Sequence, residues 1–318
     1  MRRRTALTAF TLLPGLARAQ AYPSRPIRLI IPYPPGGGTD ALARPWAERM
    51  RQRLGQPLVI ENRGGAATNI GMEMAARAAP DGQTLIINAD NVALFPHLYQ
   101  RLSYDLFRDF APITYLAQSP LVLGINPNVP ARNLREFVAL LQREPEKHAF
   151  ANPSIGSPHH LGYELFAREA RVRMIQAEYR GGGPALNDVL AGHVQLGVFS
   201  LGAVSSHFAA GTLRPLALLS PERSAAAPDI PTTAEEGFPL VVNALRFLLF
   251  APAGTPRPII EALHAATLET LAEPALREQL TRAGFDIMTT TPEQAAAMLR
   301  AEHQRWAPIL PGLNLRLD

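Results

Sequence analysis

Short apolar runs alternate with helical patterns along the first third of the chain. Apolar runs flanked by turn residues predict strands, and apolar residues spaced three to four apart predict helices. The predicted elements of this part are strands at 28–31, 58–61 and 84–88 and helices at 41–54 and about 70–79. Consecutive units of this kind predict parallel strands whose carboxyl ends share one sheet edge, where ligands bind. The loops at 32–40, 64–70 and 88–92 are therefore the expected functional segments of this part.

The pattern begins again after residue 113 and continues to the end of the chain. The predicted strands are 121–125, 149–152, 175–179, 194–199, 216–219 and 241–250, and the main predicted helices are 134–141, 257–272, 274–283 and 292–306. Several of these strands end in glycine, serine or other polar residues, as at 153–157, 180–184 and 200–202. The second series therefore predicts ligand-binding loops of its own.

A chain of 318 residues exceeds one ordinary domain. We expect an α/β protein with two lobes, each a mainly parallel sheet flanked by helices, and a ligand cleft between them. The apolar stretch at 241–250 precedes a Pro/Gly-rich segment and predicts a return crossing between the lobes. The expected lobes are 22–120 plus 247–318 and, inserted between these, 121–246.

Residues 1–21 have the composition of an export signal. Arg2, Arg3 and Arg4 precede an uncharged, largely apolar run at 5–16, and small residues follow at 17–21. This pattern predicts a signal peptide, export to the periplasm by the Sec route or, through Arg3 and Arg4, the twin-arginine route, and a mature protein from about residue 22. No later apolar stretch reaches the length of about 18 residues that a membrane helix needs, so we expect a protein that is not membrane-embedded.

The charge balance changes once this leader is set aside. The whole chain has 31 Lys+Arg against 27 Asp+Glu, and the leader holds four arginines and no acids, which leaves 27 against 27. A neutral mature chain gives no basic footprint for nucleic acid. The absence of cysteine from the sequence excludes disulfides and thiolate chemistry.

The sequence contains no convincing catalytic or metal-binding motif. The segment 197–202 spaces its first glycine one residue too far from Ser200 for a nucleophile elbow, and the adjacent His159 and His160 lack the spacing of a metal site. One competing pattern is Gly36-x-Gly38-x-x-Ala41 with an acid at Glu61, which is typical of a nicotinamide-nucleotide site. That alternative is a nucleotide-dependent oxidoreductase. Against it, two prolines crowd the turn, and such enzymes are unusual outside the cytoplasm.

The Pro/Gly loop at 32–40 suits an anion. Glycines let backbone N–H groups approach a ligand closely, and the following helix contributes unpaired donors and a positive dipole end. A loop of glycine and hydroxyl residues in each half indicates a cleft that closes on a carboxylate without a buried positive charge. The alternative for this loop is a tight turn, with Thr39 or Asp40 as the helix cap.

The motifs together resemble the Bug/TctC-like extracytoplasmic solute-binding receptors of tripartite tricarboxylate transporters. The resemblance extends over essentially the whole mature chain. It rests on the order and spacing of the segments at 22–27, 34–40, 61–63, 79–82, 109–113, 179–181, 184–186, 231–232, 236–237 and 251–256.

The resemblance implies a non-enzymatic periplasmic receptor with a two-lobed, type II binding-protein fold and no cofactor or metal. Such a receptor delivers a carboxylate-bearing solute to one large and one small membrane subunit, and we expect a monomer. A signalling partner in place of the permease is the alternative. Dicarboxylates, tricarboxylates, amino acids and aromatic acids all remain open as ligands.

Ligand contacts are expected by position from both lobes. The first lobe would contribute Tyr33, Gly36, Gly37, Gly38, Thr39, Asp40, Thr68 and Asp90, with Asp40 mainly holding its loop by capping. The second would contribute Asn152, Ser154, Gly156, Ser157, His160, Tyr179, Arg180, Gly181 and Ser200.

This chain departs from the family's usual pattern at several positions. Asn152 and Ser154 replace a usual Ser and Gly, Gln195 replaces an Asp, and Arg246 and Leu248 replace a Trp and a Gly. Arg246 has two alternatives. It either points into the cleft and binds a second carboxylate of the ligand bidentately, or pairs with an acid at the surface or hinge.

Overall fold

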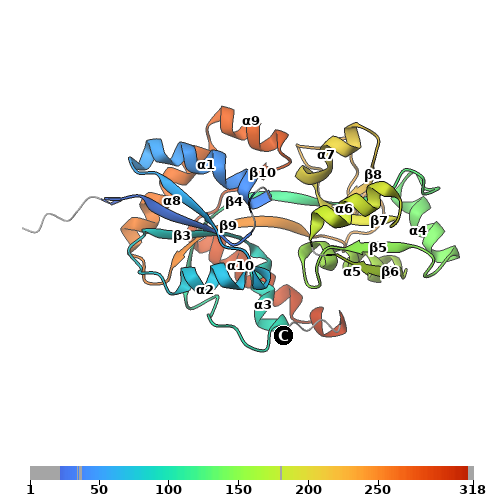
Figure 1. Cartoon of the computed structure of the whole chain (residues 1–318), viewed down its shortest axis with the longest axis horizontal. Helices are drawn as coiled ribbons and strands as arrows, with labels where there is room; N and C mark the ends of the chain where they lie inside the picture. Colours follow the sequence, from blue (N-terminus) through green and yellow to red (C-terminus); the bar gives the residue numbers. More distant parts are fainter. Residues whose placement is uncertain (1–21, 34, 36–37, 180, 314–318) are drawn as a thin grey trace, which may run out of the picture.

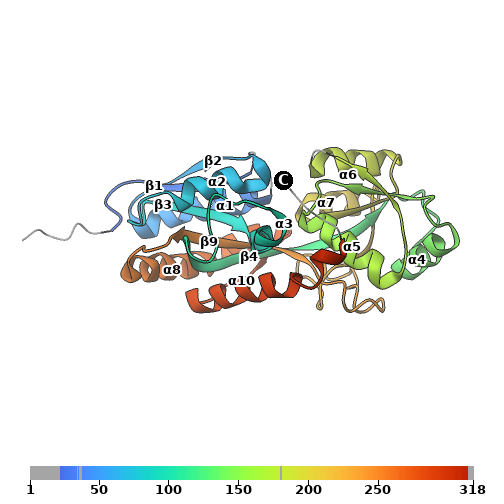
Figure 2. The same cartoon turned by 90° about the horizontal axis from the view of Figure 1, so that it is seen from below.

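The computed structural model describes residues 22–33, 35, 38–179 and 181–313 and has two lobes that are connected by two strands (Figures 1 and 2). The first lobe contains β1 (Ile27–Ile31), β2 (Leu58–Asn62), β3 (Thr84–Ala89), β9 (Ala244–Pro252), β10 (Asp286–Ile287), α1 (Gly38–Leu54), α2 (Asn69–Ala76), α3 (Phe95–Leu98), α8 (Arg257–Leu271), α9 (Pro274–Arg282) and α10 (Pro292–Trp306). The second contains β5 (Ala149–Asn152), β6 (Ile175–Glu178), β7 (Leu196–Ser200), β8 (Arg214–Leu218), α4 (Leu134–Arg143), α5 (Pro158–Ala170), α6 (Gly182–Ala191) and α7 (Leu201–Ala209). Strand β4 (Phe110–Ile125) belongs to both, and the short 3-10 turns are η1 (Ala66–Thr68), η2 (Asp90–Leu94) and η3 (Leu310–Leu313).

The strand order is β2-β1-β3-β9-β4-β7-β5-β6, with β10 and β8 also paired to β4. The βα units form the parallel pairs β1–β2, β1–β3, β5–β6 and β5–β7, as the sequence predicts. The strands that connect the lobes add antiparallel pairs, since β9 pairs with β3 and β4, and β4 pairs with β7 and β8. The carboxyl end of β3 lies beside the first residues of β9, where β9 enters the first lobe. In each lobe, the carboxyl ends of the parallel strands therefore point toward the other lobe (Figure 1).

Strand β4 corrects one sequence prediction. A new strand was expected to begin at residue 121, but β4 runs unbroken from Phe110 and changes partner from β9 to β7 between Pro120 and Leu121. This stretch contains two prolines, and proline cannot donate to a ladder. Pro112 is tolerated beside a register shift, and Pro120 is the last residue paired with β9. The lobe boundaries at 120/121 and 246/247 remain a prediction.

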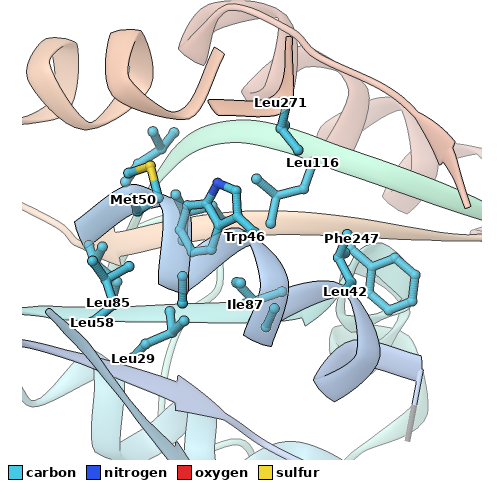
Figure 3. Packing of buried hydrophobic residues seen from close by; sticks show 14 of the residues in the cluster. Leu29, Leu42, Trp46, Met50, Leu58, Leu85, Ile87, Leu116, Phe247 and Leu271 are labelled. Atoms are coloured by element: carbon cyan, nitrogen blue, oxygen red, sulfur yellow. The ribbon is translucent and has the colours of Figure 1, made fainter. Parts of the chain in front are cut away.

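Helix α1 shows how the first lobe is held together (Figure 3). Trp46 is fully buried and packs with Leu42 and Met50 of the same helix against the apolar side chains of the sheet. Helices α8 and α9 share this face, whereas α2, α3 and α10 cover the opposite face around Trp306 and Phe250. The second lobe has two further clusters, one under α4 and α5 and one under α6 and α7. Each lobe thus has its own buried apolar layers on both faces of its sheet.

Candidate functional site

Three loops at the carboxyl edge of the first-lobe sheet are joined by Asn88, at the end of β3. Its side-chain oxygen accepts a hydrogen bond from the Tyr33 hydroxyl at 2.8 Å, and its amide group donates to the Thr68 hydroxyl at 3.2 Å. Asn88 is completely buried. The loops that follow β1, β2 and β3 are therefore fixed relative to one another by one amide side chain, and two of the predicted site residues belong to this network.

Asp40 is buried in the first turn of α1 and holds the loop that precedes it. Its carboxylate accepts hydrogen bonds from Arg44 Nε at 2.6 Å and from the Asn62 amide at 3.1 Å. Asn62 also donates to the Tyr33 carbonyl at 3.1 Å, which connects the end of β2 with the loop after β1. The paired Asp40 carboxylate thus supports the loop, and Thr39 beside it is also buried. Gly36 and Gly37 lie outside the described residues, and Gly38 begins α1.

The loop after β2 has an unusual backbone. Gly65, Ala66, Ala67 and Thr68 all have positive φ, with values of 128°, 45°, 48° and 83°. Only glycine adopts this region without strain, so three consecutive non-glycine residues there store conformational energy. Strain of this kind concentrates at binding sites.

The corresponding loop of the second lobe follows β5 and is built around His160. Its Nδ1 accepts a hydrogen bond from the Gly156 N–H at 3.1 Å, and its Nε2 lies 3.2 Å from the Glu164 carboxylate. Because Nδ1 accepts, the ring proton of the neutral imidazole lies on Nε2, the nitrogen nearest the Glu164 carboxylate. Ser157 caps α5 by accepting from the His160 backbone N–H. His160 therefore orients the loop from inside the protein rather than from its surface.

The remaining second-lobe residues cluster beside this loop. Asn152 is buried and accepts from the Ser154 N–H, while Ser154 itself is exposed. The Gly181 N–H donates to the Pro153 carbonyl at 2.9 Å, which joins the loops after β5 and β6. The Tyr179 hydroxyl donates to Asp188 at 2.6 Å, and burial together with this bond raises the pKa of Tyr179 to about 12. Ser200 ends β7, and Arg180 lies outside the described residues.

Arg246 pairs with two buried carboxylates of the first lobe, Asp90 and Glu302. Its Nε lies 2.6 Å from Asp90, and a terminal nitrogen lies 2.5 Å from Glu302. The contact with Asp90 is a close ion pair without hydrogen-bond alignment, because Nε has no hydrogen-bond partner. Both acids are almost completely buried, whereas 22% of the Arg246 side chain remains exposed. A ligand carboxylate would have to compete with two protein carboxylates for this guanidinium.

The pKa values of the two acids in this cluster are shifted in opposite directions. Burial, reinforced by the negative charge of Glu302, raises the pKa of Asp90 to about 6, although Arg246 opposes the shift. Burial also acts to raise the pKa of Glu302, but Arg246, the Trp306 indole N–H and Arg305 lower it overall. We assign the proton-binding group of the cluster to Asp90, because Glu302 has the larger number of donors.

Residues from both lobes line one small cavity beside the strands that connect them. It has a volume of about 10 Å³, and its lining includes Asp90 and Asn91 from the first lobe and Pro158 and Leu161 from the second. The buried Asn91 side-chain oxygen has no hydrogen-bond partner, and a cavity of this size holds one water molecule. The loop after β3 and the start of α5 therefore approach each other. His159, the second residue of α5, is half-buried, and burial of its ring lowers its pKa to about 4.

A larger groove lies elsewhere. It has a volume of about 930 Å³ and is formed by α5, β6 and residues 308–313. None of the predicted site residues lines it, and its charged lining residues are three arginines and two glutamates. We therefore place the candidate site at the carboxyl edges of the two sheets.

Asn62 and Asn88 hold the loops of the candidate site together, and neither was among the site residues expected from the sequence. Asn62 is the last residue of β2 and Asn88 the last but one of β3, and each follows an apolar run. That position was the available signal. Asn88 fell inside an expected functional loop, but its role in joining three loops depends on contacts between residues 20 and 55 positions apart.

Neither a metal site nor a membrane helix is evident in the part of the chain that the structure describes. Its His, Asp and Glu side chains form no group of three or more that is suited to a metal ion. Among its helices, none combines the length and the apolar character needed to cross a bilayer.

Comparisons with known proteins agree with this architecture. Residues 42–315 match the model of the tripartite tricarboxylate transporter family receptor. The chain is 37% identical over 301 residues to protein BugT of Bordetella pertussis, covering 94% of this chain and 92% of BugT. A solved structure of a periplasmic transporter is 35% identical with a TM-score of 0.84, covering 94% of this chain and 100% of that one. The structure of R. palustris Rpa4515 with adipate is 31% identical with a TM-score of 0.83, covering 90% of this chain and 96% of that one.

Proposed function

This chain belongs to the tripartite tricarboxylate transporter receptor family, and from that premise we propose that it captures a carboxylate-bearing organic anion between its lobes and delivers it to a tripartite transporter. The family consists of periplasmic solute-binding receptors and not of enzymes, which removes the oxidoreductase alternative. The observation that carries the proposal is the approach of the loop after β3 and the start of α5 around one cavity. Each lobe thus contributes groups from the carboxyl edge of its sheet.

Backbone N–H groups and hydroxyls would hold the carboxylate. In the positive-φ run at 65–68 the Thr68 N–H donates to the Gly65 carbonyl at 3.0 Å, so the backbone donors proposed for the carboxylate in this loop are the N–H groups of Ala66 and Ala67. The Thr68 hydroxyl and the start of α1 add donors in the first lobe, and the exposed Ser154 hydroxyl adds a donor in the second, where the Gly156 N–H already donates to His160. Arg246 is paired with Asp90 and Glu302, so we propose that it takes no direct part in binding the carboxylate.

The ligand class is a small organic carboxylate. Rpa4515 was solved with adipate, so dicarboxylates of similar length lead the candidates for this chain. The partners would be one large and one small membrane subunit, and the receptor would act as a periplasmic monomer after removal of residues 1–21. The basic, apolar leader supports this location.

A thermal-shift screen with organic acids, followed by calorimetric titration, tests the proposal. A ligand present at 100 times its Kd stabilises the folded state by about 2.7 kcal/mol, which appears as a clear rise in Tm. Thr68→Val removes one proposed hydroxyl contact and should weaken binding about tenfold, corresponding to about 1.4 kcal/mol. Ser206→Ala, which removes an exposed hydroxyl from α7, serves as the control and should bind as the parent does. Absence of stabilisation by every mono-, di- and tricarboxylate would refute the proposal.

A further inference from the structure

The lobes also touch on the face of β4 and β9 that carries α7 and α9 (Figure 1). Gly202, in the first turn of α7, lies against the turn formed by Ala283 and Gly284 at the end of α9. A Cβ atom on Gly202 would lie 2.2 Å from the Ala283 carbonyl oxygen, and one on Gly284 would lie 2.4 Å from the Gly202 backbone nitrogen. The backbones of the two lobes are thus as close as two glycines permit.

We propose that Gly202, Ala283 and Gly284 form an interlobe pivot, and that the two glycines are positioning residues that set the angle between the lobes. Ordinary contact of a Cβ atom begins at 3.4 Å, so a methyl group on Gly202 would require a separation of about 1.2 Å more. The contact lies two residues after Ser200, a proposed ligand-binding residue. The pivot therefore acts next to the place where the second lobe would meet the ligand.

Both sides of the pivot are anchored in their own lobes. Gly284 N–H donates to Thr281, the Ser119 hydroxyl donates to the Gly284 carbonyl at 3.2 Å, and the next residue, Phe285, is buried in the first-lobe core. On the other side, Leu201 is buried beside Gly202, in the cluster under α6 and α7. Because neither segment is free to shift locally, added bulk would be transmitted to the orientation of the lobes.

A second bridge lies beside the pivot. Ser224, in the loop after β8, donates its hydroxyl to the Asp286 carboxylate in β10, 3.0 Å from each oxygen. The carboxyl group of Asp286 also accepts from the backbone N–H groups of Ala225 and Ala226, and burial raises its pKa. This bridge restrains rotation at the pivot without filling space.

Electrostatics favour the contact as well. Ala283 caps the carboxyl end of α9, where carbonyl oxygens carry partial negative charge, and it meets the first turn of α7, where N–H groups carry partial positive charge. The two helix ends therefore attract each other. The attraction keeps the pivot closed while the rest of the interlobe surface moves.

Distances between two spin labels in the ligand-free protein test the inference independently of any ligand. The sequence has no cysteine, so Glu48→Cys in α1 and Asn187→Cys in α6, both exposed, carry the only labels. Gly202→Ala should increase the mean distance and Gly202→Leu should increase it further, by pulsed electron paramagnetic resonance. Alanine is favoured over glycine inside a helix, so Gly202→Ala should fold.

Two further variants distinguish the effect of a larger side chain at the pivot from the effect of the hydrogen bond between Ser224 and Asp286. Gly312→Ala adds a methyl group where no atom lies within 4 Å and should leave the distance unchanged. Ser224→Ala removes the second bridge without adding bulk and should broaden the distance distribution. The pivot is refuted if Gly202→Leu, folded by circular dichroism, retains the parental distance. A parental distribution for Ser224→Ala would refute the role of the bridge.

Discussion

Asp90→Asn tests the electrostatics of the buried cluster most directly. Asp90 is only 2% exposed and carries its charge beside both Arg246 and Glu302. The substitution removes the ionisable group, while the amide oxygen still accepts the hydrogen bond that Tyr115 donates at 3.3 Å. Arg246 retains its ion pair with Glu302. The variant therefore isolates the proton equilibrium of one carboxyl group.

The raised pKa of Asp90 determines whether stability rises or falls with pH. Asp90 has a pKa of about 6 in the folded protein against an ordinary value of 3.8. Between these values the folded protein holds a proton that the unfolded chain has released, so stability falls as the pH rises through this window. From pH 5 to pH 7.5 the shift removes about 1.4 kcal/mol of unfolding free energy, a tenfold change in the equilibrium constant. Over the whole window, from well below pH 3.8 to above pH 7, the loss of unfolding free energy amounts to about 3 kcal/mol.

Urea denaturation at pH 5, 6, 7 and 7.5, followed by circular dichroism, measures the effect. The unfolding free energy of Asp90→Asn minus that of the parent should increase by about 1.4 kcal/mol between pH 5 and pH 7.5. Asp109→Asn is the control, because Arg108 and the Asp105 backbone N–H lower the pKa of Asp109, so this carboxyl is ionised in both states above pH 5. Its difference from the parent should stay constant over this range. A pH-independent difference for Asp90→Asn would contradict the assigned proton-binding role.

Three further outcomes are expected from the same structure. Arg246→Met leaves two buried carboxylates without their shared cation and should lower the unfolding free energy by about 3–5 kcal/mol in urea denaturation; a loss below 1 kcal/mol would contradict the ion-pair geometry. Asn88→Ala leaves the Tyr33 hydroxyl without its hydrogen-bond acceptor and should destabilise the protein by about 1–3 kcal/mol. It should also weaken carboxylate binding, measured by calorimetry; unchanged affinity would contradict a role of Asn88 in the binding site. His160→Ala leaves the Gly156 N–H without its acceptor and should cost about 1–3 kcal/mol of stability, with faster hydrogen exchange at Gly156. Unchanged exchange there would contradict the role of His160.

The local architecture could be predicted because it depends on neighbours along the chain. The apolar run that became β1 and the spacing of Leu42, Trp46 and Met50 that became α1 are short-range signals. The same applies to the polar residues at strand ends. The continuity of β4 could not be predicted in this way, because Pro112 and Pro120 are tolerated only through a register shift and a change of partner that depend on other strands.

In the candidate site, too, features set by neighbours along the chain could be predicted, and features set by tertiary contacts could not. The order of its loops follows from the parallel strands, so Tyr33, Thr68 and Ser157 lie where they were expected, although their contact with a ligand stays a prediction. The partners of Arg246 could not be predicted, since residues 90 and 302 meet it only through the packing of η2 and α10 around β9. The contact between Gly202 and Gly284 likewise arises only from the tertiary arrangement.

The pairing of β4 with β9 has a consequence for protein engineering. Pro120, the last residue of β4 that pairs with β9, is the direct antiparallel partner of Ala244, the first residue of β9. The ends of the intervening segment are therefore about 5 Å apart, as for any pair of adjacent strands. The segment 121–243 has adjacent ends, so its exchange between relatives needs only two junctions, both at this residue pair of the ladder. Such chimaeras would keep the buried layers of the recipient lobe intact while exchanging half of the recognition surface.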